Sequence, residues 1–214
     1  MYIPKHFLES RLEVLHAFIR RHPLATICVS DGSGLEADHL PLTLRSEPAP
    51  HGVLLGHVAR ANPLWRKAGD GLDCLVVFHG PQHYISPSGY VTKAETGRVV
   101  PTWNYEVVHA RGRLCAVDDP VRLRVLLEEL TAEHERQQPH AWHVSDAPGD
   151  YIDALVRAVV GLRIEILDLV GKSKLSQNQP DANQRSLVET LRAKGDSSAL
   201  QMADAIAQRT SGRS

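Results

Sequence analysis

Apolar and polar residues alternate along this 214-residue chain with a period that changes from segment to segment. Residues 9–21 place apolar side chains at helical spacing, which predicts an amphipathic helix. Later apolar runs are short and β-rich, and they predict strands over 24–30, 35–44, 53–58, 72–78, 83–86, 99–117 (with a break near Gly112) and 162–170. The runs come as hairpins, with 83–86 as the partner of 72–78, and not as regular β–α units. The pattern therefore predicts an α+β fold, mainly antiparallel β, closed into a Greek-key-like barrel with peripheral helices.

Cap residues mark two further helices. Asp119 suits an N-cap position and Pro120 suits the first helical position, so a helix begins there. Another helix begins near Ser145, and we expect it to end at Gly161, because glycine often caps helix C-termini.

The C-terminal segment differs from the rest of the chain. Residues 171–214 predict two short helices, broken at 195–197, after a main domain over 1–170. The helices carry an apolar stripe that is larger than a lone tail needs, which favours a homodimer: Leu187, Leu191, Leu200, Ala203 and Ile206. The pair has helix–turn–helix proportions, but its second helix has one basic residue, near its end. Packing or dimerisation is therefore a better interpretation than DNA reading.

Composition narrows the class of protein. The formal net charge is −1, so no overall basic field attracts nucleic acid or a membrane. The three cysteines are far apart in apolar runs and predict reduced thiols in a cytoplasmic protein, not a disulfide framework. We identify no signal peptide at the N-terminus and no apolar run of membrane-spanning length.

Candidate binding residues gather in two places. Five aromatic residues lie between Phe78 and Tyr105 among histidines, hydroxyls and amides, and Arg60 follows a strand end directly before the turn residues Asn62 and Pro63. Aromatic surface with a bidentate cation suits a planar, phosphorylated ligand. The alternatives are a strand core with polar loops and a solvated loop arginine. As a turn residue, Arg60 is not expected to contribute to the stability of the fold.

Other kinds of site find no support in the sequence. The twelve histidines include no HExxH pair, and we expect no metal site. There is no GxSxG nucleophile motif, no GxGxxG and no P-loop, so nucleotide binding of the Rossmann or Walker type is excluded.

Several segments resemble one family in the correct order over nearly the whole chain. They are MYIPKHF at the start, ADHLPL at 37–42, GHVARANPLW at 56–65, YISPSGY at 84–90, VPTWNY at 100–105, VSDAPGDYI at 144–152 and GKSKLSQN at 171–178. This set is similar to the PaiB family, FMN-binding negative transcriptional regulators of bacteria. The resemblance implies an FMN-binding split barrel and a homodimer with flavin at the subunit interface. DNA is implied as a partner only because the family is one of transcriptional regulators.

The resemblance also implies cofactor-binding positions. The turn formed by His57, Val58, Ala59, Arg60 and Asn62 looks like the phosphate-binding turn of split barrels. By the same analogy, His39, Leu40 and Pro41 run beside the ribityl chain, and Trp103 and Asn104 flank the ring system. Lys174, Ser176 and Gln177 reach in from the other subunit. No catalytic residue is assigned.

Two positions depart from the family pattern. Gly89 and Ser173 stand where the family usually has tryptophan. Two other functions on the same fold stay open: a flavin-dependent oxidoreductase, with His57, His83 and His109 as the available acid–base groups, and a haem-binding barrel.

Overall fold

The computed structural model describes residues 1–32, 34–48, 50–69 and 71–211. The chain forms two units from interleaved segments: unit 1 takes residues 1–10, 79–108 and 170–214, and unit 2 takes 11–78 and 109–169. Unit 1 joins the C-terminal segment to residues 1–10 and 79–108, and the expected division into 1–170 and 171–214 stays a prediction. The last three residues of the expected C-terminal segment lie outside the described residues.

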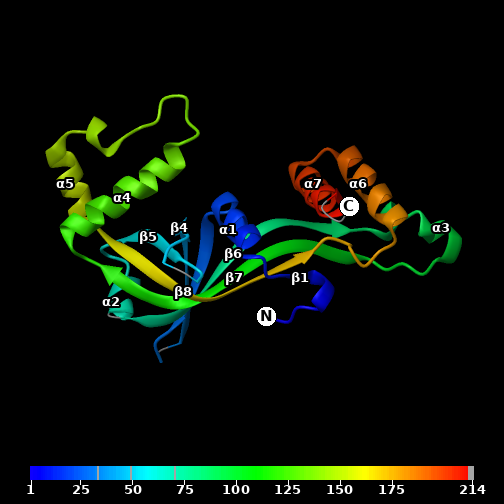
Figure 1. The fold of residues 1–214 in the computed structure, drawn as a ribbon, viewed down its shortest axis with the longest axis horizontal. Helices are drawn as coiled ribbons and strands as arrows, with labels where there is room; N and C mark the ends of the chain where they lie inside the picture. The colour runs from blue at the N-terminus through cyan, green and yellow to red at the C-terminus, as the bar shows by residue number, and fades with distance from the viewer. Residues whose placement is uncertain (33, 49, 70, 212–214) are drawn as a thin grey trace. The chain divides into compact units, whose positions relative to one another are not determined.

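The strands form a mainly antiparallel sheet, as the sequence predicts. They are β1 (Leu8–Glu9), β2 (Leu24–Ser30), β3 (Leu35–Pro41), β4 (Thr43–Arg45), β5 (Val53–Ala59), β6 (Leu72–Ile85), β7 (Thr102–Val117) and β8 (Val159–Lys174) (Figure 1). Hydrogen bonding orders them β3-β2-β6-β7-β8-β5-β4, and β1 pairs with β8 outside this path. Strands β6, β7 and β8 each contribute residues to both units.

A bend at Leu42 curves the sheet of unit 2. The sequence predicts one strand over 35–44, but β3 pairs with β2 while β4 pairs with β5. Leu42 lies between them, is buried, and donates its N–H to the carbonyl oxygen of Pro23 at 2.8 Å. Gly56 makes room for it, since a Cβ there would lie 2.6 Å from the Leu42 side chain. The sheet is open in its hydrogen bonding, and Leu42 joins its two end strands covalently.

The expected hairpin between 72–78 and 83–86 is wrong. Residues 72–85 form the single strand β6. A hairpin loop over 79–82 requires the chain to leave the extended conformation, and glycine is the residue that most readily does so with positive φ. Gly80 is not among the glycines with positive φ, so the chain continues in an extended conformation.

Two glycines serve close packing where the sequence suggests chain breaks. Strand β7 runs unbroken through Gly112, where a Cβ would lie 2.3 Å from the carbonyl oxygen of Glu165. Gly161 lies inside β8 and does not end a helix, because α5 (Gly149–Arg157) already ends at Arg157. A Cβ at Gly161 would lie 3.1 Å from Val117.

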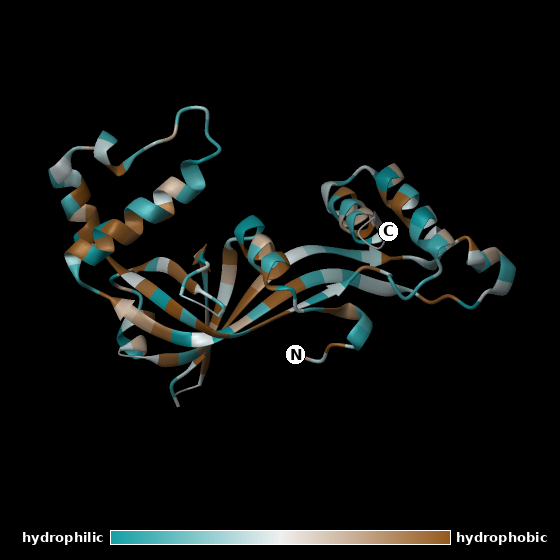
Figure 2. Ribbon diagram, viewed as in Figure 1, coloured by the Kyte–Doolittle hydropathy of each residue, from teal (hydrophilic) through white to brown (hydrophobic). Residues whose placement is uncertain are grey.

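The remaining helices are α1 (Leu12–Arg21), α2 (Leu64–Ala68), α3 (Thr92–Thr96), α4 (Pro120–Glu135), α6 (Asp181–Lys194) and α7 (Ser197–Ser211), with short 3₁₀ turns η1 (Lys5–Phe7), η2 (Pro87–Gly89) and η3 (Val144–Asp146). The expected cap of α4 is confirmed, since the Asp119 side chain accepts the N–H of Arg122 at 2.9 Å. Helices α4 and α5 of unit 2 join through the buried residues Leu123, Ile152 and Val156. Figure 2 shows hydrophobic positions on both helices where they meet.

Helices α6 and α7 pack within unit 1. Leu187, Leu191, Ala203 and Ile206 share a buried cluster with side chains from the same unit: Ile85, Tyr90 and Leu175. Of the expected dimerisation stripe, Leu200 remains exposed. The stripe is therefore covered within the chain and does not itself require a second subunit, and the homodimer stays a prediction.

The cysteines and the helices bear on two expectations drawn from the composition. None of the three cysteines forms a disulfide, and burial raises the pKa of the Cys74 thiol to about 12. In the described part of the chain, no helix combines the length and apolarity that crossing a membrane requires.

The close approach of β7 and β8 gives a test. We expect Gly112→Ala to lower the free energy of unfolding by about 1–3 kcal/mol, because the new methyl group meets a backbone oxygen that cannot move aside. Gly149→Ala is the matched control, since nothing lies within 4 Å of a Cβ there. Urea denaturation of both variants measures the difference, and equal midpoints would contradict this packing.

Candidate functional site

Arg60 is placed by the register of β5 on β8. Ala59 pairs with Val159, and the Arg60 N–H continues the ladder to the carbonyl oxygen of Ala158 at 2.8 Å. The following turn is fixed by Asn62, whose Oδ1 accepts the N–H of Leu64 at 2.8 Å. These backbone contacts hold Arg60 at the point where β5 ends and β8 begins.

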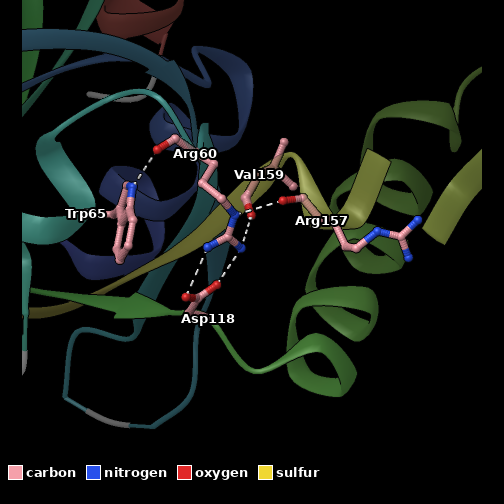
Figure 3. Close-up of polar contacts among 5 residues, drawn as sticks. All are labelled: Arg60, Trp65, Asp118, Arg157 and Val159. Atoms are coloured by element: carbon pink, nitrogen blue, oxygen red, sulfur yellow. Dashed lines mark hydrogen bonds and ion pairs between the residues drawn. The ribbon is translucent and has the colours of Figure 1, made fainter. Parts of the chain in front are cut away.

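The Arg60 guanidinium makes four hydrogen bonds within unit 2 (Figure 3). Its Nε donates to the carbonyl oxygen of Arg157 at 2.7 Å and Nη2 donates to that of Val159 at 3.0 Å. Along the other edge, Nη1 and Nη2 donate to the two carboxylate oxygens of Asp118 at 3.1 and 2.6 Å. One edge therefore binds backbone oxygens and the other binds an oxyanion bidentately. These contacts give Arg60 structural partners that the sequence did not indicate.

Trp65 supports the same arginine. Its indole Nε1 donates to the Arg60 carbonyl oxygen at 2.9 Å. The guanidinium carbons of Arg60 and Arg66 lie 5.7 and 4.7 Å from the centre of the indole ring, within the range of cation–π attraction. Trp65 thus fixes the backbone of the turn and contacts the cation.

The pKa shifts of Arg60 and Asp118 both favour the charged forms of the two side chains. The hydrogen bond from Arg60 lowers the pKa of the Asp118 carboxyl, and the hydrogen bond to Asp118 raises the pKa of Arg60. Both groups are charged at neutral pH. Both side chains are also partly open to solvent, at 38% for Arg60 and 45% for Asp118, so the attraction is screened. Asp118 directly precedes the N-cap of α4, where the helix dipole favours negative charge.

The other residues expected in unit 2 lie nearby along β3 and β5. The Asn62 amide donates to Asp38 at 2.8 Å, which joins the turn to the strand that carries His39. His39 is exposed, with Nδ1 3.1 Å from the Thr26 hydroxyl, while Leu40 is half-buried and Pro41 exposed. In β5, Val58 is buried and Ala59 exposed. Burial lowers the pKa of His57, so this imidazole is neutral at pH 7.

In unit 1, Asn104 and Ser176 form a buried polar cluster. The Asn104 amide is fully buried, and its Nδ2 donates to the Ser176 hydroxyl at 2.9 Å. The Tyr90 hydroxyl lies 3.4 Å from the same oxygen, and burial raises the pKa of Tyr90. Ser176 has a φ of 60°, a left-handed conformation. The Asn104 Oδ1 atom has no hydrogen-bond partner among the described residues.

The remaining expected residues of unit 1 differ in how far their polar groups are engaged. Gln177 is turned inward: its Oε1 accepts the Leu175 N–H at 2.7 Å, and its Nε2 donates to backbone oxygens of His6 and Ser173. Lys174 donates to the Thr102 hydroxyl. The Trp103 ring is 49% exposed and donates to Gln82 at 3.2 Å. Trp103 therefore presents an open aromatic surface, while Gln177 does not present an open polar one.

Both departures from the family pattern have local explanations. A Cβ at Gly89 would lie 3.2 Å from the Leu187 side chain of α6, so a larger side chain there needs local adjustment of Leu187. Ser173 is buried and donates its hydroxyl to Glu106 at 2.7 Å.

Sequence reasoning missed Asp118 and Trp65. Asp118 is 58 positions from Arg60 in the chain, and no spacing motif connects the two residues. Trp65 lies within the GHVARANPLW segment, but its indole contact depends on how the turn folds.

Comparisons with known proteins agree with this fold. Residues 1–168 match a family described as "Putative FMN-binding domain". The Bacillus subtilis "Protease synthase and sporulation protein PAI 2" is 31% identical over 207 residues, covering 95% of each chain. A protein from Aspergillus fumigatus is 28% identical over 254 residues, covering 98% of this chain and 97% of its own, so relatives are not confined to bacteria.

Solved structures share the fold at low identity. The FAD and heme binding protein of Mycobacterium smegmatis has a TM-score of 0.56 at 14% identity, covering 86% of this chain and 80% of its own. The flavocytochrome Anf3 of Azotobacter vinelandii has a TM-score of 0.52 at 12% identity, covering 80% and 72%. These likenesses show the split-barrel fold alone. With the family match, which brings FMN as its cofactor, they lead to one conclusion: this chain belongs to the FMN-binding split-barrel family that includes PAI 2.

Proposed function

We propose that this FMN-binding protein is a regulator, and that the Arg60 guanidinium binds the phosphate of FMN. One observation carries the proposal: two backbone carbonyls orient Arg60, and its other edge already holds an oxyanion bidentately. Carboxylates and phosphates present the same paired oxygens to a guanidinium. The nearby N-terminus of α4 adds a second positive feature.

The Arg60 turn and the segment with Lys174 are two candidate positions for the phosphate, and the Arg60 turn lies within the residues that match the FMN-binding family. Residues 1–168 include Arg60, Asp118 and the carbonyl groups that orient the arginine. The match ends before Lys174, Ser176 and Gln177. Those residues, with Trp103 and Asn104, stay separate predictions.

A regulatory role is supported by the relative and by the chemistry of the described residues. The name of PAI 2 connects that protein with protease synthesis and sporulation. Bound FMN supplies a redox-active ring. His57, one of the acid–base groups considered from the sequence, is half-buried with a lowered pKa and is poorly suited to donating a proton at neutral pH.

Helices α6 and α7 are poorly arranged to read DNA. Helix α7 turns Ala199, Met202 and Ala203 into the core of unit 1. Its basic residue, Arg209, pairs with Glu9 at 3.1 Å. A recognition helix needs an exposed basic and polar face, which this arrangement does not provide.

The phosphate placement predicts a selective loss of affinity. We expect Arg60→Ala to weaken FMN binding about 10–100-fold, because a dianion loses its bidentate partner. Riboflavin, which lacks the phosphate, keeps its affinity. Fluorescence titrations of Arg60→Ala and of the control Arg66→Ala measure this. Equal FMN affinity in the two variants would refute the placement, and a Soret band with no flavin bands in the purified protein would refute flavin binding.

The four contacts of Arg60 also predict an effect on stability. We expect Arg60→Ala to lower the melting temperature relative to the parent, because the ends of β5, β7 and β8 lose a common hydrogen-bond donor. Arg66→Ala retains these four contacts and loses its cation–π contact with Trp65, so its melting temperature should fall less than that of Arg60→Ala. Circular dichroism melts of the flavin-free proteins compare them, and an unchanged melting temperature for Arg60→Ala would count against the contacts described.

The packing of α7 predicts weak DNA binding. We expect the isolated protein to bind DNA without sequence preference, and only at low salt. Fluorescence anisotropy with a pool of genomic fragments at physiological ionic strength measures this. Site-specific binding at nanomolar concentration would show that the chain itself is a DNA-reading repressor.

A further inference from the structure

The two edges of the Arg60 guanidinium differ in how easily they exchange partners. The carbonyl groups of Arg157 and Val159 belong to the backbone where α5 ends and β8 begins, so they cannot leave without unfolding that junction. Asp118 contributes only a side chain, which is 45% exposed. Rotation of that side chain breaks no strand pairing, because Asp118 follows the last residue of β7.

The cap of α4 does not depend on Asp118 either. Asp119 accepts the N–H of Arg122 with its side chain, and its carbonyl oxygen accepts the N–H of Leu123. Asp118 can therefore leave Arg60 while α4 stays capped. The contact that is lost is the one that joins the β7–α4 junction to the ends of β5 and β8.

We propose that Asp118 is a tethered competitor for the phosphate, and that binding of FMN exchanges the Asp118 carboxylate for the phosphate on Arg60. The inference rests on the proposed phosphate placement. While Asp118 holds the Nη1–Nη2 edge of Arg60, the pair fixes the start of α4 against β5 and β8. In the FMN-bound chain this connection is released, so the state of the β7–α4 junction reports whether the cofactor is bound.

The charges favour the exchange. A phosphate monoester carries about −1.5 to −2 charges at pH 7 and offers three acceptor oxygens, against one charge and two oxygens for the carboxylate. Tethering gives the carboxylate a high effective concentration, so ligands that bind Arg60 weakly do not displace it. The apparent affinity for FMN is reduced by the fraction of chains in which Asp118 occupies the site.

Removal of the competitor tests the proposal. Asp118→Asn keeps the shape of the side chain and removes its charge, and we expect FMN affinity to rise about 2–5-fold, as suits an exposed ion pair, with riboflavin affinity unchanged. Asp153→Asn is the matched control, because Asp153 forms another exposed pair with Arg124, between α5 and α4, that does not touch Arg60. This control should bind both flavins as the parent does.

A second readout follows the junction itself. By hydrogen exchange, we expect FMN to speed exchange in the peptide over residues 117–123 of the parent, and we expect Asp118→Asn to exchange fast there without flavin. Riboflavin should leave the parent unchanged. Weaker or equal FMN binding by Asp118→Asn, with Arg60→Ala still impaired, overturns the competitor and gives Asp118 the role of orienting Arg60. An Arg60→Ala variant that binds FMN normally overturns the phosphate placement and the competitor together.

Discussion

One guanidinium joins three strand ends in unit 2. Strand β8 lies between β7 and β5 in the sheet, so a side chain from the end of β5 must cross the first residue of β8 to reach β7. Arg60 does this, donating to backbone oxygens at the start of β8 and to Asp118 after β7. Arginine offers five N–H donors in a rigid plane, which suits a role that lysine cannot fill. Asn62 accepts the N–H of Leu64 and Trp65 donates to the Arg60 carbonyl oxygen, and these contacts hold the turn that presents the guanidinium.

Part of the fold is set by local sequence and was therefore predictable. Strand β2 has the expected bounds because Ala25, Ile27 and Val29 alternate cleanly with less buried residues. The cap at Asp119 needs only neighbouring residues. The break between α6 and α7 is also local, since Gly195 takes a φ of 74° that most side chains disfavour.

The errors have a common physical origin. Gly112 and Gly161 read as breaks in the sequence, but their role is to admit Glu165 and Val117, which are distant in the chain. The apolar stripe of the tail packs against Ile85, Tyr90 and Leu175 of the same chain, so it does not itself require a partner subunit, and the homodimer stays a prediction. A glycine or a leucine looks the same in the sequence whether the residue it contacts is near in the chain, distant in the chain or in another subunit.

In the candidate site, too, the sequence does not reveal a contact between residues that are distant in the chain. The segment GHVARANPLW and the family resemblance pointed to Arg60, but not to the carboxylate that occupies its outer edge. The family likeness indicates FMN, and the contacts of Arg60 show that Asp118 occupies the edge where we propose that the phosphate binds.

The most direct test is a crystal structure of the chain bound to FMN. The account predicts the phosphate on the Nη1–Nη2 edge of Arg60, the Asp118 carboxylate turned away, and the bonds to the carbonyl oxygens of Arg157 and Val159 retained. A phosphate bound elsewhere, with the Arg60–Asp118 pair intact, would contradict it.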